Sequence, residues 1–221
     1  MQQFNRYWRL LVTQLLWKPF LGKLGPRSVL YKPMLITGAK RIFIGQQCHI
    51  RNFARIEVIH RPEMGWDATL KIGNRVGIEQ GAHIVCQSDV TIEDDVAITA
   101  YCAIVDTYHP HDPPDRSPKI GNRLPSERTF VHIGAGTIIG MNTVVLPNVR
   151  IGKGCVIGAG SVVNRDVPDY SIAAGAPARV LSTFDTAARK WNRVAAATGN
   201  STGAQGYPGA PFRRSNQISD A

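Results

Sequence analysis

The stretch 133–167, IGAGTIIGMNTVVLPNVRIGKGCVIGAGSVVNRDV, repeats with a period of six residues. The first position of each block is Ile or Val, the fifth is small or β-branched, and the second is often Gly. The first positions are Ile133, Ile139, Val145, Ile151, Ile157 and Val163, and the fifth positions are Thr137, Thr143, Val149, Cys155, Ser161 and Val167. A helix repeats its side-chain direction every 3.6 residues and a strand every 2, so neither produces this pattern. A period of six fits a short flat strand followed by a tight corner.

Three such sides close into a triangular coil of about 18 residues, and stacked coils pair their backbones about 4.8 Å apart. The large aliphatic residue and the small fifth residue point inward, where each coil covers its neighbour. The sequence therefore predicts an all-β chain, a parallel β-helix with a protruding loop and short helical ends. A chain of 221 residues has room for one such domain.

Outside this stretch the period is less regular. It begins weakly at Ile36 and clearly at Ile44, is interrupted over 60–71, and breaks over 106–130, which is rich in Pro and charge. We expect a surface loop at 106–130. The predicted domains are a helical and irregular segment at 1–35, the β-helix at 36–181, and a short C-terminal helix with a disordered tail at 182–221.

The segment 4–21 mixes aromatic residues, leucines and basic residues, and Lys18-Pro19 is expected to end its helix. One interpretation is a cap on the open end of the solenoid. The other is an interfacial helix on the inner membrane, with its basic residues near anionic lipid.

The net charge is +10 and the basic residues are spread along the chain. They are not interleaved with exposed aromatic residues on one element, which argues against nucleic acid as a partner and leaves phosphorylated cofactors, sugar nucleotides or membranes. Cys48, Cys102 and Cys155 occupy fifth positions, which predicts buried reduced thiols. No signal peptide and no apolar run of 18 residues is present, so we expect a cytoplasmic protein.

The loop opens with Asp106-Thr107-Tyr108-His109-Pro110. A neutral imidazole at the base of a loop can take a hydroxyl proton, so His109 is the candidate general base. Asp106, three residues earlier, is a candidate to orient the ring. His111 competes with His109 for this role, and His83, on the preceding coil, is a further candidate to contact the substrate.

These features resemble the hexapeptide-repeat acyltransferases, which are left-handed parallel β-helices, and above all the bacterial cell-surface polysaccharide O-acetyltransferases. Asp106 and His109 match the Asp-x-x-His of the latter. The resemblance implies the left hand of the coil, acetyl-CoA as co-substrate, no metal, and a homotrimer with sites between subunits. It also implies that His109 deprotonates the acceptor hydroxyl and that the Met141 N–H stabilises the oxyanion.

The same resemblance suggests which residues hold coenzyme A. Ile138 (often Trp in the family), Gly140 and Met141 would lie at the pantetheine arm and thioester. Ala159 would bond the pantetheine through its backbone. A basic residue and an Arg near the phosphates correspond to Arg165 and Arg179, with Asn164 where Thr or Ser is common.

The sequence thus predicts an acetyl-CoA-dependent O-acetyltransferase acting on a sugar or glycan hydroxyl, in cell-surface polysaccharide or lipopolysaccharide biosynthesis. The alternatives are a sugar-nucleotide N-acetyltransferase and a non-catalytic hexapeptide scaffold. The spacing of the histidines does not fit the zinc site of hexapeptide carbonic anhydrases. The residues before the repeat are too few for the nucleotide-binding domain of the sugar-phosphate uridylyltransferases.

Overall fold

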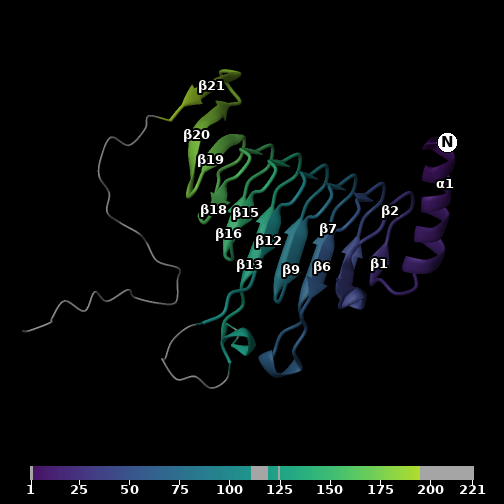
Figure 1. Ribbon diagram of the computed structural model, residues 1–221. Coiled ribbons are helices and arrows are strands. Elements are labelled where there is room, and N and C mark those ends of the chain that lie inside the picture. The colour runs from purple at the N-terminus through teal and green to yellow at the C-terminus, as the bar shows by residue number, and fades with distance from the viewer. Residues whose placement is uncertain (1, 111–118, 124, 195–221) are drawn as a thin grey trace, which may run out of the picture.

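The computed structural model describes residues 2–110, 119–123 and 125–194 and contains a left-handed parallel β-helix with an α-helix at one end (Figure 1). Its coils each place one strand in sheet A, one in sheet B and one in sheet C. We call the turns between them the AB, BC and CA corners.

Sheet A and sheet C each hold six parallel strands. Sheet A consists of β1 (Lys23–Leu24), β4 (Ile42–Ile44), β7 (Thr69–Ile72), β10 (Asp89–Ile92), β13 (Phe130–Ile133) and β16 (Val149–Ile151). Sheet C consists of β3 (Leu35–Thr37), β6 (Arg55–Val58), β9 (His83–Cys86), β12 (Ala103–Val105), β15 (Val144–Val145) and β18 (Val162–Val163).

Sheet B has nine strands, of which the first seven are parallel. They are β2 (Val29–Leu30), β5 (His49–Ile50), β8 (Gly77–Ile78), β11 (Ala97–Ile98), β14 (Ile138–Ile139), β17 (Val156–Ile157) and β19 (Ser171–Gly175). The last two, β20 (Ala178–Asp185) and β21 (Lys190–Arg193), extend the sheet as an antiparallel hairpin.

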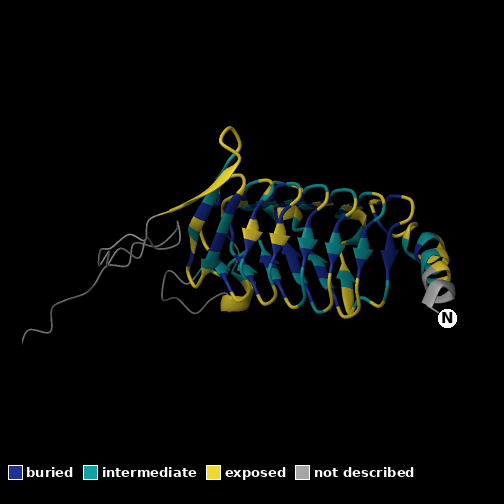
Figure 2. Ribbon diagram, turned by 90° about the horizontal axis from the view of Figure 1, so that it is seen from above, coloured by how far each residue is buried: buried dark blue, intermediate teal, exposed yellow. Residues whose placement is uncertain are grey.

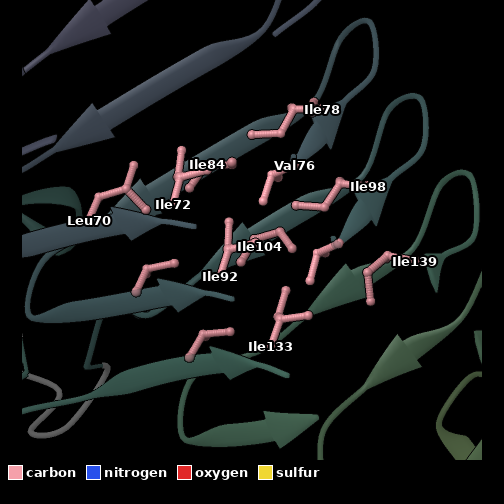
Figure 3. Packing of buried hydrophobic residues seen from close by; sticks show 14 of the residues in the cluster. Leu70, Ile72, Val76, Ile78, Ile84, Ile92, Ile98, Ile104, Ile133 and Ile139 are labelled. Carbon is pink, nitrogen blue, oxygen red and sulfur yellow. The ribbon is translucent and has the colours of Figure 1, made fainter. Parts of the chain in front are cut away.

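The core is a column of aliphatic side chains inside the triangle (Figure 3). Residues at equivalent positions stack directly, since Ile78, Ile98 and Ile139 occupy paired positions on successive strands of sheet B. Each is fully buried. All four cysteines are buried free thiols, and burial raises the pKa of each of them. The predicted period and the core positions of Cys48, Cys102 and Cys155 are thereby confirmed.

Two excursions leave the solenoid, and both do so at the CA corner, where they hang from the same edge (Figure 1). The first connects β6 to β7 and contains the 3-10 turn Pro62–Met64. The second connects β12 to β13 and contains the 3-10 turn Ile120–Asn122. The sequence places both correctly, because a hexapeptide side cannot hold so many Pro and charged residues.

The solenoid begins earlier than the predicted residue 36, because β1 and β2 pair with β4 and β5. The period was present in the spacing of Leu24, Leu30 and Ile36. The period of six was missed there because Leu24 and Leu30 replace the usual Ile and because Pro26 and Pro33 interrupt the pattern. Both prolines lie outside strands, where they remove no ladder hydrogen bond.

The short C-terminal helix predicted after residue 182 is wrong. The described part of this segment forms β20 and β21, in which Phe184 pairs with Trp191 at 5.2 Å between ring centroids. Cross-strand aromatic pairs stabilise hairpins, and β19 offers an unpaired backbone edge. The Asp185 carboxylate accepts the N–H groups of Ala187 and Ala188 and closes the turn.

Candidate active site

His109 lies at the base of the second excursion, exposed to solvent. Its Nδ1 is 2.9 Å from the carbonyl oxygen of Arg123, on the returning arm of the same loop. A carbonyl oxygen only accepts, so this contact puts the proton of the neutral ring on Nδ1. The Nε2 atom then carries the lone pair that a general base requires.

Asp106 does not orient His109 as predicted. Its carboxylate is fully buried and accepts the backbone N–H groups of Gln87, Ser88 and Asp89 at 2.6–2.9 Å. The Arg123 carbonyl oxygen, and not Asp106, holds the His109 ring. Burial is the main cause that raises the pKa of Asp106, to about 6, although the three N–H donors oppose it. Asp106 therefore pins the start of the loop to the CA corner of the coil before.

Buried polar atoms without a hydrogen-bond partner collect beside this loop. Within the described part of the chain, such side-chain atoms lie on sheet C or at its CA corner; they are His60 Nδ1, His83 Nε2, Gln87 Nε2 and Thr129 Oγ1, together with Arg55 Nε, which is in an ion pair with the Glu57 carboxylate. Buried polar groups are normally satisfied. Apart from Arg55, the His83 side chain is the most exposed of these, at 41%, so its ring is the one that a polar ligand can best reach.

His83 lies in β9, on the sheet C face next to Glu57 and Arg55, which form an ion pair. Its Nε2 is 3.8 Å from a Glu57 oxygen. Burial, followed by the nearby Arg55 charge, lowers the pKa of His83, so the ring is neutral at pH 7. His111, the predicted competitor of His109, lies outside the described residues.

The predicted coenzyme A residues begin at the BC corner. Met141 and Ala159 occupy equivalent turns on consecutive coils, joined by the bond from the Gly160 N–H to the Met141 carbonyl at 2.7 Å. Both residues are exposed, and no acceptor in the described residues takes the N–H of either. Ile138, in the strand β14 that leads into the Met141 turn, is 46% exposed and adds an apolar surface.

Glycine is required at this corner by close packing between coils. A Cβ atom on Gly140 would lie 2.5 Å from the Ala159 nitrogen and 2.6 Å from the Ile157 carbonyl oxygen. Asn142 and Gly160, which follow the exposed residues, have positive φ, the conformation that closes a tight turn. The turns therefore stay short and leave their amides open.

At the AB corner the equivalent backbone N–H groups donate to side chains of the protein. The N–H groups of Gln46, Asn74 and Lys153 donate to side chains of the next coil, Asn74, Asp94 and Asp169 respectively. The N–H of Ala135 donates to Glu93. These turns are sealed by the protein itself, so the open amides of the BC corner are a property of that corner.

The remaining predicted residues divide between two corners. Arg179 lies in β20, just after the turn that follows β19, and its guanidinium bonds the Ala178 carbonyl. Asn164 and Arg165 lie at the CA corner after β18, exposed. Arg165 thus shares its corner with His109, whereas Ala159 and Arg179 belong to the end of sheet B.

One chain does not bring the predicted site together. His109 lies at the CA corner and Met141 at the BC corner, and the width of sheet C separates them. The sequence contained no signal for this division, or for the contact between His109 and the Arg123 carbonyl. The division depends on how separate coils stack.

Comparisons with known proteins agree with this architecture. The bacterial transferase hexapeptide family (six repeats) matches residues 130–165. The chain is 32% identical over 186 residues to an acetyltransferase of Mycobacterium tuberculosis, Rv3034c, covering 80% of this chain and 56% of that protein. It is 32% identical over 125 residues to WbbJ of Escherichia coli, whose name assigns it to O-acetyl transfer in lipopolysaccharide biosynthesis; 55% of this chain and 64% of WbbJ are covered.

The chain thus spans between about half and two thirds of the length of these relatives. Among solved structures, AntD of Bacillus cereus, an N-acyltransferase in complex with dTDP and 3-hydroxybutyryl-CoA, matches with a TM-score of 0.61 and 19% identity. That match covers 76% of this chain and 86% of AntD, and it supports the fold.

Proposed function

The chain belongs to the hexapeptide-repeat acetyltransferase family, and we propose that it transfers an acetyl group from acetyl-CoA to a hydroxyl of a sugar or glycan. The observation that carries the proposal is the contact between His109 Nδ1 and the Arg123 carbonyl, since it leaves Nε2 as a base at the mouth of a loop. A scaffold without catalysis has no use for a ring held in that tautomer.

The reaction proceeds in a ternary complex. The acceptor hydroxyl attacks the thioester carbon while His109 Nε2 takes its proton, and the carbonyl oxygen becomes an oxyanion. The Met141 N–H donates to that oxyanion. When the carbon–sulfur bond breaks, the leaving CoA thiolate takes the proton back from the His109 imidazolium, so the base returns to its neutral form. No protein nucleophile takes part.

The pantetheine arm of acetyl-CoA lies along the BC corner, against Ile138 and Gly140, with its amides bonded to the open backbone at Met141 and Ala159. Arg165 and Arg179 bind the CoA phosphates, and Asn164 lies beside them. The open amides of the BC corner, in contrast to the sealed AB corner, support this placement.

The acceptor lies against sheet C and the CA corner, where the partly exposed His83 ring can bond a sugar hydroxyl. His111, on the same loop as His109, is a further candidate to contact the acceptor. The alternative acceptor is the amino group of a nucleotide-linked sugar, for which the same base would serve.

The functional unit is a homotrimer. A second copy that brings its BC corner to the CA corner of the first would join Met141 to His109 and exclude water from the reacting atoms. We place the enzyme in the cytoplasm, where cell-surface glycans are assembled from activated precursors.

The proposal is tested by following the release of CoA thiol from acetyl-CoA with a panel of acceptors. The panel comprises simple glycosides, sugar nucleotides, amino sugars and lipid-linked oligosaccharides. We expect thiol release to require a hydroxyl-bearing glycan, with the acetyl group recovered as an ester that is labile in mild alkali. An alkali-stable amide would identify the N-acetyltransferase alternative, and thiol release that no acceptor stimulates would contradict both.

A further inference from the structure

The N-terminal helix α1 (Gln2–Val12) and the π-helical turn that continues it, Thr13–Trp17, lie across the end of the solenoid (Figures 1 and 2). The first coil has no neighbour on this side, so its backbone needs other partners. Thr13 Oγ1 accepts the Leu30 N–H at 3.1 Å, and its single proton is within donating distance of the Arg9 carbonyl at 2.7 Å and the Leu30 carbonyl at 3.2 Å. Gln14 donates to the Gly25 and Ser28 carbonyls.

The segment is therefore a cap, as one interpretation of the sequence holds, but the capping is done mainly by polar side chains. Arg9 Nη1 donates to the Tyr31 carbonyl at 3.0 Å on the same side. Trp17 and Leu21 add the apolar contact, since both pack against the core. The polar side of the helix faces the protein.

The apolar side of the helix consequently faces outward. Six large apolar side chains on this segment are more than half exposed: Tyr7, Trp8, Leu11, Leu15, Leu16 and Phe20. Tyr7, Leu11 and Leu15 follow the spacing of one helical face. A helix on a water-soluble surface normally buries its apolar stripe, so this arrangement is inverted and requires something outside the chain to cover it.

The charge of the chain identifies what covers it. Residues 1–56 contain ten Lys and Arg and no Asp or Glu, whereas residues 57–221 contain sixteen of each sign. The basic residues are spread, as expected, but the whole net charge of +10 belongs to the N-terminal segment and the first two coils. Around the exposed apolar face, Lys18, Lys23 and Arg27 are exposed.

We infer that this end of the solenoid docks on the surface of an anionic phospholipid bilayer. Aromatic and leucine side chains enter the boundary of headgroups and acyl chains, and the basic residues face the lipid phosphates. None of the helices in the described ranges is long and apolar enough to cross a bilayer, so the helix lies in the surface. The solenoid axis then points away from the membrane, with Met141, four coils on, about 20 Å beyond the first coil.

Vesicle flotation of the full chain tests this inference independently of any acetyl transfer. We expect binding to vesicles of phosphatidylcholine mixed with phosphatidylglycerol, weaker binding to phosphatidylcholine alone, and release by salt. The double variant Trp8→Ser/Leu15→Ser should bind at least about tenfold more weakly. The double variant Leu181→Ser/Trp191→Ser is the matched control, because it removes two exposed apolar side chains at the opposite end.

A second pair of variants separates charge from apolar contact. Lys18→Gln/Lys23→Gln should weaken binding to the anionic vesicles, while Lys71→Gln/Lys153→Gln, exposed on later coils, should leave it unchanged. Quenching of tryptophan fluorescence by brominated lipid should fall in Trp8→Phe. Binding that survives both N-terminal double variants, or no binding at all, would overturn the inference. If Trp8→Ser/Leu15→Ser instead lowers the mass measured by light scattering without lipid, the face is an interface between copies and the inference is wrong.

Discussion

The BC and CA corners of this solenoid are built from the same repeat but carry opposite kinds of chemistry. The BC corner keeps short turns in every coil and offers backbone N–H groups, including those of Met141 and Ala159. The CA corner holds both excursions, His109 and the buried polar atoms of His60, Gln87 and Thr129 that lack partners. One corner is suited to an extended ligand that bonds backbone, and the other to a polar acceptor beside a base.

The difference follows from where the coil tolerates insertion. A column of open amides persists only if each turn stays short, and the left-handed residues Asn142 and Gly160 keep them so. An insertion at this corner would interrupt the column. At the CA corner the insertions cost little, because Asp106 anchors the loop through three backbone N–H groups. Each strand of sheet C runs from the BC corner to the CA corner, so the two corners of one chain lie apart. Neither corner alone provides all the residues of the predicted site.

The largest effect is expected at the CA corner. His109→Ala removes the proposed base and should lower kcat roughly 10²–10⁴-fold, with little change in acetyl-CoA binding by calorimetry. His132→Ala is the control, because His132 lies on sheet A, paired with Glu93 at 3.1 Å, away from the proposed site. Near-normal turnover by His109→Ala would remove the CA corner from the chemistry.

The matching change at the BC corner is Met141→Pro. The Thr143 N–H bonds the Gly140 carbonyl and Asn142 has positive φ, so Met141 occupies the second position of a turn that accepts proline. The substitution deletes the N–H and also replaces the Met side chain, and we expect kcat to fall about 10²–10³-fold. Met141→Ala keeps the N–H and should remain active; equal losses in both variants would assign the effect to the side chain.

The fold was largely predictable from sequence because the period of six is set by inward-facing residues. The pattern of 133–167 needs no knowledge of distant contacts. The prediction of the fold from sequence failed at the two ends of the solenoid, where a coil has only one neighbour. At the N-terminus Leu24, Leu30 and Ile36 kept the spacing without the usual Ile-Gly, and at the C-terminus the β19 edge recruited Phe184 and Trp191 into a hairpin.

The site was less predictable, since its parts depend on coil stacking. His109 and Met141 were predicted from motif resemblance and remain a prediction, while the corners at which they lie follow from the fold. The orienting partner of His109 is a backbone carbonyl, which has no sequence signature. The nearest carboxylate in sequence, Asp106, is directed instead to the turn of the coil before.

A smaller effect is expected on coenzyme A affinity. Arg165→Gln should raise KM for acetyl-CoA about tenfold with a modest change in kcat, because a charged hydrogen bond to phosphate is lost. Arg150→Gln is the control, since Arg150 is exposed on sheet A over the Phe130 ring. An unchanged KM, measured in steady-state kinetics, would separate Arg165 from the phosphate site.

The smallest expected effect is on stability, at Asp106, the residue that anchors the start of the loop. Asp106→Asn replaces one acceptor oxygen by an amide nitrogen that cannot accept a backbone N–H, and should cost about 1–3 kcal/mol in the free energy of unfolding at pH 7. Asp94→Asn, at the exposed AB corner, should cost less.

The stability difference between Asp106→Asn and wild type should also depend on pH. The pKa of Asp106 is raised to about 6, so the folded protein binds this proton more tightly than the unfolded chain. Its contribution to stability is full below the unfolded value and is lost as pH rises through 6. Urea unfolding should therefore show the deficit of Asp106→Asn widening from pH 7 to pH 4.5; a constant deficit would contradict the assignment.

The claim that the site is shared between copies is tested most directly by mixing two inactive chains. His109→Ala lacks the base but has an intact BC corner, and Met141→Pro has the reverse defects. Co-expression with two different affinity tags, followed by purification through both, isolates the hybrids. If each site takes one corner from each of two chains, every hybrid trimer has one intact site in three, and the activity of the purified hybrids should return toward about one third of wild type. Hybrids that stay as inactive as the parents would contradict the shared site.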